Sequence, residues 1–215
     1  MCGIVGAFGT RGNFTMEALH KATEALYHRG PDGRQHWMSE DGRVGLGHSR
    51  LSIIDLEGGT QPLQNEDGSI HAVVNGELYD FERIRRGLEE KGHRFSTASD
   101  SEILIHLYEE SGVDALHELR GEFAFILYDS NTRRLFAARD RFGVKPLYYT
   151  YFNNVLYLAS EIKALLAAGA DAVWDEESLY ISFHLGVVPM QDRTFFKGVY
   201  QVPPAHYMIA SNDQY

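Results

Sequence analysis

Cys2 is the residue with the most direct chemical potential in this sequence, because it stands immediately after the initiator Met1. Removal of Met1, which is usual before a small residue, gives Cys2 a free α-amino group close to its own thiol. That amine has a reference pKa of about 8 and the thiol one of about 8.5, so the amine can accept the thiol proton directly or through a water. Nucleophile and base then lie on one residue. The alternative is that Cys2 is merely a small apolar residue at the start of a strand.

The composition indicates one acidic domain. The chain has 215 residues, of which 44% are hydrophobic, and this suffices for one sizeable core. Its formal net charge of -10 gives no electrostatic footprint for nucleic acid or for an anionic membrane. No stretch approaches the ~20 apolar residues that cross a bilayer, and the first residues lack secretory features. A single cysteine excludes an internal disulfide, and we therefore expect a cytoplasmic protein.

The first third of the chain combines short strands with one helix. Residues 4–8 are an apolar run that predicts a core strand at the N-terminus. Thr15 is the predicted N-cap of a helix whose apolar face includes Leu19. Alternating residues predict further strands over residues 43–49 and 71–74. These elements must position Cys2 and the polar residues at the strand ends.

Two more helices are predicted in the middle of the chain. One runs from Phe81 to Lys91, with Asp80 as its cap. The other starts at Ser99, whose hydroxyl and the Glu102 carboxylate have the spacing of a capping box. This spacing places Asp100 at the first helical position.

The second half is rich in antiparallel strands. Hairpins are predicted over residues 123–138 and 147–159. Helices among such strands, without a regular strand–helix repeat, favour layers of helix on antiparallel sheets over a doubly wound parallel sheet. Residues 206–210 predict a strand and residues 211–214 a turn that awaits a return strand. We therefore expect the chain to be part of something longer.

Several short motifs carry a resemblance to a known family. They follow one another in the family order and cover most of residues 2–165, with a further match at residues 202–206. The motifs occupy residues 1–6, 28–32, 50–55, 75–79, 99–102, 121–125 and 139–149. With them the sequence resembles class II glutamine amidotransferases, most of all the glutaminase domain of glutamine-hydrolysing asparagine synthetases.

The resemblance implies an α+β fold, a four-layer αββα sandwich of two antiparallel sheets between helices, of the N-terminal-nucleophile hydrolase type. It implies that residues 1–215 are a single glutaminase domain, the N-terminal part of a longer synthetase. The Ser-Gly-Gly-x-Asp-Ser loop of the family's ATP-using domain does not occur in this sequence. This domain needs no cofactor, and ATP and Mg are expected only for the absent synthetase domain.

The resemblance assigns the binding of glutamine to two charged residues. Arg50 would hold the α-carboxylate with its planar fork, a geometry that lysine cannot reproduce. Asp100 would pair with the α-ammonium group. Without the neighbouring motifs, a surface arginine in a salt bridge is the preferred interpretation of Arg50, and Asp100 could equally serve only to favour the helix dipole.

The resemblance also assigns an oxyanion hole. The side-chain amide of Asn75 and the backbone N–H of Gly76 would face the oxygen of the tetrahedral intermediate. The alternative for Asn-Gly after a strand is a tight hairpin turn, although a predicted helix follows soon after. The remaining residues expected to line the glutamine pocket are Leu51, Ser52, Ile53, Ile54 and Glu77.

The implied reaction is acyl transfer. Cys2 attacks the side-chain amide, ammonia leaves, and water hydrolyses the γ-glutamyl thioester to glutamate. The expected partners are L-glutamine and a synthetase domain, in the same chain or in a partner subunit, that receives the ammonia; a homodimer is compatible with the sequence. The ten histidines show no metal-ligand spacing, so no metal is expected. The alternatives are a non-catalytic interaction or regulatory domain, and a glutaminase that feeds another acceptor.

Overall fold

The computed structural model describes residues 1–9, 14–52, 55, 58–188 and 192–211. These residues form a six-stranded sheet with the order β10-β8-β9-β1-β3-β2 and a five-stranded sheet with the order β11-β7-β6-β5-β4. All strand pairs in both sheets are antiparallel. The first sheet contains β1 (Gly3–Gly9), β2 (Gly33–Met38), β3 (Val44–Arg50), β8 (Tyr148–Phe152), β9 (Val155–Ala159) and β10 (Val199–Gln201). The second contains β4 (Leu63–Gln64), β5 (Ile70–Leu78), β6 (Gly121–Asp129), β7 (Arg134–Arg139) and β11 (Tyr207–Ser211).

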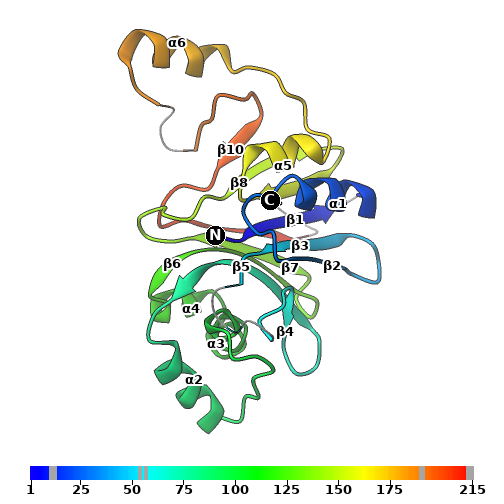
Figure 1. The fold of residues 1–215 in the computed structure, drawn as a ribbon, viewed down its shortest axis with the longest axis vertical. Helices are drawn as coiled ribbons and strands as arrows, with labels where there is room; N and C mark the ends of the chain where they lie inside the picture. Colours follow the sequence, from blue (N-terminus) through cyan, green and yellow to red (C-terminus); the bar gives the residue numbers. More distant parts are fainter. Residues whose placement is uncertain (10–13, 53–54, 56–57, 189–191, 212–215) are drawn as a thin grey trace.

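Helices lie outside both sheets, which face each other (Figure 1). Three apolar cores separate the four layers: one between the sheets, and one between each sheet and its helices. The predicted αββα sandwich of two antiparallel sheets is confirmed. The six-stranded sheet carries α1 (Met16–Glu24) and α5 (Ile162–Ala167), and the five-stranded sheet carries α2 (Phe81–Glu90), α3 (Ile103–Ser111) and α4 (Ala115–Glu118).

The helix α6 (Glu176–Leu185) lies apart from the layers, at the top of Figure 1. None of the helices in the described part of the chain combines the length and the apolar character that crossing a bilayer requires.

Strand β1 is buried on both faces and pairs on both edges. Ile4 and Phe8 point into the core between the sheets, and Val5 and Ala7 point toward α1 and α5. Because both faces need apolar side chains, the strand reads as a continuous apolar run instead of an alternation. Its edges pair with β3 and β9. The predicted core strand at the N-terminus is therefore confirmed, and neighbouring elements contact it on both faces and both edges.

Strand β5 is longer than the sequence predicted. It runs on through Asn75 and Gly76 to Leu78 and pairs with β6 along its whole length. The interpretation of Asn75-Gly76 as a hairpin turn is therefore wrong. The chain leaves the sheet at Asp80, which has a positive φ of 58°, and enters α2 at once. Pairing with β6 overrides the local turn preference of the Asn-Gly pair.

Two predicted helix caps differ from the observed ones. Asp80 holds the N-cap position of α2 without a side-chain cap hydrogen bond, and its carboxylate lies 3.4 Å from Arg120. Ser99 does cap the 3-10 helix η1 (Asp100–Glu102) that precedes α3, but the Glu102 carboxylate does not reach back to it. It accepts hydrogen bonds from the backbone and hydroxyl groups of Ser96 and Thr97 instead. The capping box is therefore wrong, because the loop before Ser99 offers Glu102 four donors.

The low pKa values of two buried histidines predict that the free energy of unfolding falls in acid. Burial lowers the pKa of His48 to about 3 and that of His71 to about 4. The unfolded chain binds protons at these histidines below about pH 6.5 and the folded chain does not, so stability falls as pH drops below that value. Between pH 7.5 and 5.5 we expect each histidine to cost roughly 1 kcal/mol of unfolding free energy.

A His71→Phe variant tests this expectation by urea unfolding at both pH values. Phenylalanine keeps the ring that stacks on Trp37 at a centroid distance of 3.9 Å and removes the titrating group. The variant should lose about 1 kcal/mol less than the parent between pH 7.5 and 5.5. An equal loss in both proteins would show that His71 is not part of the acid sensitivity.

Candidate active site

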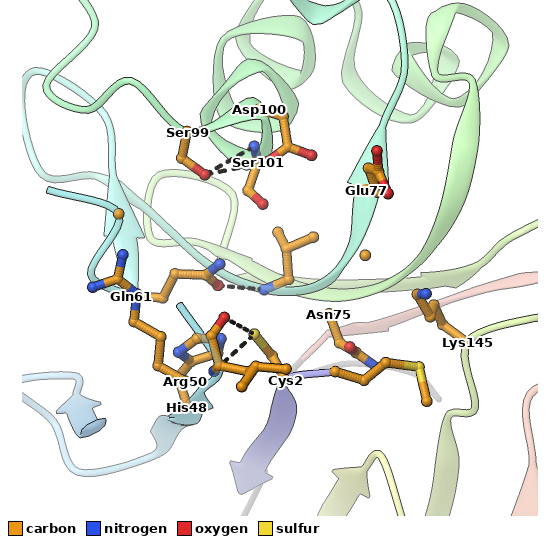
Figure 2. A pocket seen from close by; sticks show the side chains of 15 residues that line it. Cys2, His48, Arg50, Gln61, Asn75, Glu77, Ser99, Asp100, Ser101 and Lys145 are labelled. Carbon is orange, nitrogen blue, oxygen red and sulfur yellow. Dashed lines mark hydrogen bonds between the residues drawn. The ribbon is translucent and has the colours of Figure 1, made fainter. Parts of the chain in front are cut away.

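A cavity of about 200 Å³ lies where β1, β3 and β5 meet the loop that leads to η1. Figure 2 shows Cys2, His48 and Arg50 on one side of it and Ser99, Asp100 and Ser101 on the opposite side. Folding has brought these residues together from positions up to about a hundred apart in the chain. The described lining consists of Met1, Cys2, His48, Arg50, Leu51, Gly59, Gln61, Val74, Asn75, Gly76, Glu77, Ser99, Asp100, Ser101 and Lys145.

The Cys2 thiol lies against the backbone of Leu51. Its Sγ is 3.4 Å from the Leu51 nitrogen, which donates to it, and 3.7 Å from the Leu51 carbonyl oxygen, to which it donates. The pairing of β1 with β3 brings the two together, because Gly3 lies opposite Ser49. The thiol therefore stands at the cavity with one hydrogen-bond donor already in place.

Arg29 anchors the start of β1 and was not predicted from the sequence. Its Nε donates to the Cys2 carbonyl oxygen at 2.9 Å, and its Nη1 lies 2.8 Å from Glu161. Burial alone would raise the pKa of Glu161, but hydrogen bonds from Arg29 and His28 outweigh it and lower that pKa. The pair therefore stays ionised and joins the turn after α1 to the residue before α5. It fixes the peptide that carries the Cys2 thiol.

Met1 lines the cavity, and its presence changes the acid–base chemistry of Cys2. In its presence the nitrogen of Cys2 is a peptide nitrogen, which cannot accept a proton. The free amine is then that of Met1, whose pKa burial lowers. The self-activation of Cys2 therefore depends on removal of Met1.

Asn75 contributes a buried donor without a partner. Its side chain is 1% exposed, and its Nδ2 makes no hydrogen bond with the residues that the structure describes. A buried amide of this kind costs roughly 1–3 kcal/mol if nothing pairs with it. A ligand oxygen at the cavity would supply the missing acceptor.

The N–H groups of β5 follow a pattern that singles out Gly76. On the edge away from β6, the Val74 N–H donates to the Gln61 side chain at 2.6 Å, and the Leu78 N–H donates to Asp100 at 2.7 Å. Because N–H groups alternate between the two edges of a strand, the N–H of Gly76 lies on this same edge, between the other two. The N–H groups on either side of it are already bonded to side chains. Gly76 is therefore the position at which this edge faces the cavity.

Arg50 and Asp100 lie on opposite sides of the cavity, and Asp55 connects them. The Arg50 Nη2 donates to the Asp55 carbonyl oxygen, while the Asp55 carboxylate accepts from the N–H of Ala98 at 2.8 Å. The residue that positions the guanidinium thus also holds the segment that leads to Asp100. Asp55 belongs to the motif of residues 50–55, but sequence reasoning gave it no role.

Asp100 is a buried carboxylate with few neighbours of opposite charge. Its side chain is 3% exposed. Burial raises its pKa, while hydrogen bonds from Leu78, Ser101 and Ser99 work in the opposite direction. An ammonium group bound beside it would favour the charged form and lower the pKa again. The arrangement therefore favours a cationic ligand on this side of the cavity.

The sequence-predicted residues fall into three groups. Cys2, Arg50, Leu51, Asn75, Gly76, Glu77 and Asp100 all line the cavity. Ser52 is not among the described lining residues, and its N–H donates to the Asp32 carboxylate at 2.7 Å. Ile53 and Ile54 lie outside the described residues, so their predicted contacts stay predictions.

Several lining residues were missed by sequence reasoning. Gln61 is buried and holds β5, and Lys145 is 8% exposed with its Nζ 3.4 Å from Glu122. His48 is buried beside Arg50 and uncharged at neutral pH, since burial and the Arg50 charge lower its pKa to about 3. Lys145 stood within the motif of residues 139–149, whereas Gln61 and His48 carried no signal.

Comparison with known sequences identifies relatives of this chain. The sequence profile of the glutamine amidotransferase domain matches residues 1–215. Amidase chry2 of Gibberella zeae is 49% identical over 195 residues, which are 90% of this chain and 28% of that protein. Glutamine-hydrolysing asparagine synthetase 1 of Bacillus subtilis is 42% identical over 85% of this chain and 30% of its own length. The chain thus spans less than a third of these relatives.

Solved structures show the same fold at low sequence identity. The allosteric regulatory enzyme of purine biosynthesis superposes with a TM-score of 0.75 at 22% identity, over 99% of this chain and 48% of that one. Glutamine phosphoribosylpyrophosphate amidotransferase of B. subtilis gives 0.73 at 20% identity, over the same shares. These likenesses support the sandwich of two antiparallel sheets.

Close packing at Gly76 predicts that alanine is not tolerated there. A Cβ at this position would lie 2.5 Å from the Glu122 carbonyl oxygen and 2.7 Å from the Phe123 Cβ. We expect Gly76→Ala to lower the free energy of unfolding by roughly 1–3 kcal/mol, because β5 or β6 must shift. Urea unfolding followed by circular dichroism measures this change.

Gly87 provides the matched control. It lies in α2, where an added Cβ meets nothing within 4 Å. Gly87→Ala should therefore stabilise the protein by roughly 0.5–1 kcal/mol through helix propensity. Equal effects at both glycines would contradict the packing argument.

Proposed function

Because the chain belongs to the glutamine amidotransferase domain family, we propose that Cys2, exposed by removal of Met1, is the nucleophile that hydrolyses L-glutamine to glutamate and ammonia. The observation that carries this proposal is the joint placement of one thiol, one unpartnered buried amide and two opposite charges around a single cavity. The thiol would attack the side-chain amide of glutamine, and the buried amide would bind its oxygen. The two charges would pair with its α-carboxylate and α-ammonium groups.

We place glutamine in the cavity in one orientation. Its α-carboxylate pairs with Arg50 and its α-ammonium with Asp100, so its side chain extends toward Cys2. The amide oxygen then faces the Nδ2 of Asn75 and the N–H of Gly76. Glu77 and the Leu51 backbone complete the walls, and contacts of Ser52, Ile53 and Ile54 with glutamine remain predictions. A site that pairs both charged groups rejects amides that lack either one.

The reaction proceeds by acyl transfer through the thiol. The α-amine of Cys2 takes the thiol proton, and sulfur attacks the side-chain carbonyl carbon. The tetrahedral oxyanion is stabilised by Asn75 and Gly76. Collapse breaks the C–N bond, and the leaving amine takes the proton from the Cys2 ammonium and departs as ammonia. Water, activated by the same amine, hydrolyses the thioester to glutamate and frees the thiol.

We propose that residues 1–215 act as the glutaminase domain of a longer asparagine synthetase, whose ATP-using domain amidates aspartate with the released ammonia. The support is the 42% identity to a B. subtilis asparagine synthetase. A second candidate is a different acceptor, because Amidase chry2 and Amidase chyE of Penicillium rubens are 49% and 46% identical to this chain. Both candidates use the same glutaminase chemistry.

An Asn75→Ala variant tests the oxyanion role. Loss of one such donor typically lowers kcat roughly 100- to 1000-fold, while KM should change little because the donor acts mainly in the transition state. Glutamate release by the processed protein measures both constants. A variant that is folded by circular dichroism and keeps wild-type kcat would remove Asn75 from the mechanism.

An Arg50→Lys variant tests substrate recognition. Lysine keeps the charge but loses the bidentate fork, so we expect KM for glutamine to rise by about 10-fold or more. Arg34→Lys, on the neighbouring strand β2 and paired with Glu24, is the matched control and should keep the wild-type KM. Equal KM values in both variants would contradict the assignment of Arg50.

A further inference from the structure

Four side chains that can bind a metal gather away from the Cys2 cavity, beside the helices of the five-stranded sheet. One donor atom from each of Glu66, His93, His106 and Glu109 lies within 4.8 Å of the others. They come from the turn after β4, the loop after α2, and α3. His106 and Glu109 are three residues apart on α3 and therefore share a face. Folding alone assembles the group, which explains why no ligand spacing was visible in the sequence.

The distances from each histidine to the two carboxylates are close to those between neighbouring ligands of a tetrahedral ion. The Nδ1 of His106 lies 3.1 Å from Glu109 and 3.7 Å from Glu66. The Nδ1 of His93 lies 3.6 Å from Glu109 and 3.8 Å from Glu66. Zinc bonds of about 2.0–2.1 Å in a tetrahedron separate neighbouring ligand atoms by about 3.3 Å. Because all four donor atoms lie within 4.8 Å of one another, binding of an ion would have to draw them closer together.

Both imidazoles are backed by carboxylates on their outer nitrogens. The Nε2 of His93 lies 3.2 Å from Glu110, and the Nε2 of His106 lies 3.7 Å from Glu102. A carboxylate behind the imidazole is the usual outer partner of a metal-binding histidine, since it orients the ring and raises its basicity. Both rings therefore present Nδ1 to the centre of the group.

The two carboxylate ligands are also held from behind. The Oε1 of Glu109 accepts from the Asn65 side chain at 2.8 Å, and the Oε1 of Glu66 accepts from the Arg94 N–H at 2.7 Å. The Oε2 of Glu109 faces both histidines, whereas Glu66 turns its Oε2 toward His106 and its Oε1 toward His93. His93, Glu109 and Glu66 are thus oriented by hydrogen bonds to neighbours before any ion binds.

Burial and charge favour a cation at this place. The His106 side chain is fully buried, and its Nε2 makes no hydrogen bond with the described residues. Glu66, Glu102 and Glu109 surround it, so a positive charge is needed there, either a proton on the imidazole or a metal ion. The Glu66 side chain is 35% exposed, which leaves a path from solvent.

We propose that Glu66, His93, His106 and Glu109 form a structural site for a divalent ion of the zinc type. Two imidazole nitrogens and two carboxylate oxygens are a donor set that suits zinc better than magnesium, which prefers six oxygens. A bound ion would tie the His93 loop to α3. Because that loop continues to Asp100, the ion would stiffen the side of the Cys2 cavity that Asp100 forms.

Titration of the purified, tag-free protein with zinc tests the proposal. A Cys2→Ala background removes the thiol as a competing ligand. Calorimetry should give one zinc ion per chain, Co²⁺ should give the intense visible absorption of a tetrahedral site, and Mg²⁺ should not compete. His93→Asn and Glu109→Gln should each weaken zinc binding by about 100-fold or more, and Glu110→Gln by about 10-fold, since loss of an outer partner alone costs 10- to 100-fold.

His117→Asn and Glu118→Gln are the matched controls, because both residues are exposed on α4, outside the group. They should bind zinc as the Cys2→Ala parent does. Circular dichroism without metal checks that His93→Asn and Glu109→Gln are folded. Absence of saturable zinc binding in the parent would show that a proton alone fills the site, and unchanged binding in both ligand variants would place the ion elsewhere. Either result overturns the proposal.

Discussion

The site depends on how firmly the first residues of the chain are held. An N-terminal nucleophile has covalent support on one side only, so its position must come from the strand that follows and from contacts to its own peptide. Here β1 lies between β3 and β9 with both faces buried, and Arg29 binds the Cys2 carbonyl oxygen. The half-buried partner of Arg29, Glu161, stays ionised through the same contact. The thiol then meets the Leu51 backbone, and every other feature of the cavity is arranged around that fixed point.

The facing wall is an edge of β5 that no long strand covers. β4 pairs only with residues 71 and 72, so beyond them Gln61 and Asp100 bind the N–H groups of Val74 and Leu78. These contacts leave the strand position of Gly76 facing the cavity. Asp100 therefore has two tasks: one carboxylate oxygen holds the strand, and its negative charge remains available to a cationic ligand. These two tasks explain why a carboxylate occupies this position although its burial costs free energy.

Much of the fold was readable from the sequence because its strongest patterns reflect burial. The apolar run of residues 4–8 and the hairpins of the second half gave the layers correctly. The errors arose where distant segments override local preference. Asn75-Gly76 has the composition of a turn, but pairing with β6 keeps it extended, and Glu102 has the spacing of a cap but binds Ser96 and Thr97 instead. In the site, resemblance located Cys2, Arg50 and Asp100, whereas Arg29 and Gln61 act through contacts that local sequence does not encode.

The central claim is that Cys2 is a terminal nucleophile in a cavity shaped for glutamine. Intact mass spectrometry of the purified protein, before and after incubation with an electrophilic glutamine analogue, tests it most directly, with Cys2→Ala as the control. The account predicts a mass that lacks Met1 and a single adduct that the Cys2→Ala variant does not form. Retained Met1, or processed protein that stays unmodified at saturating analogue, would contradict it.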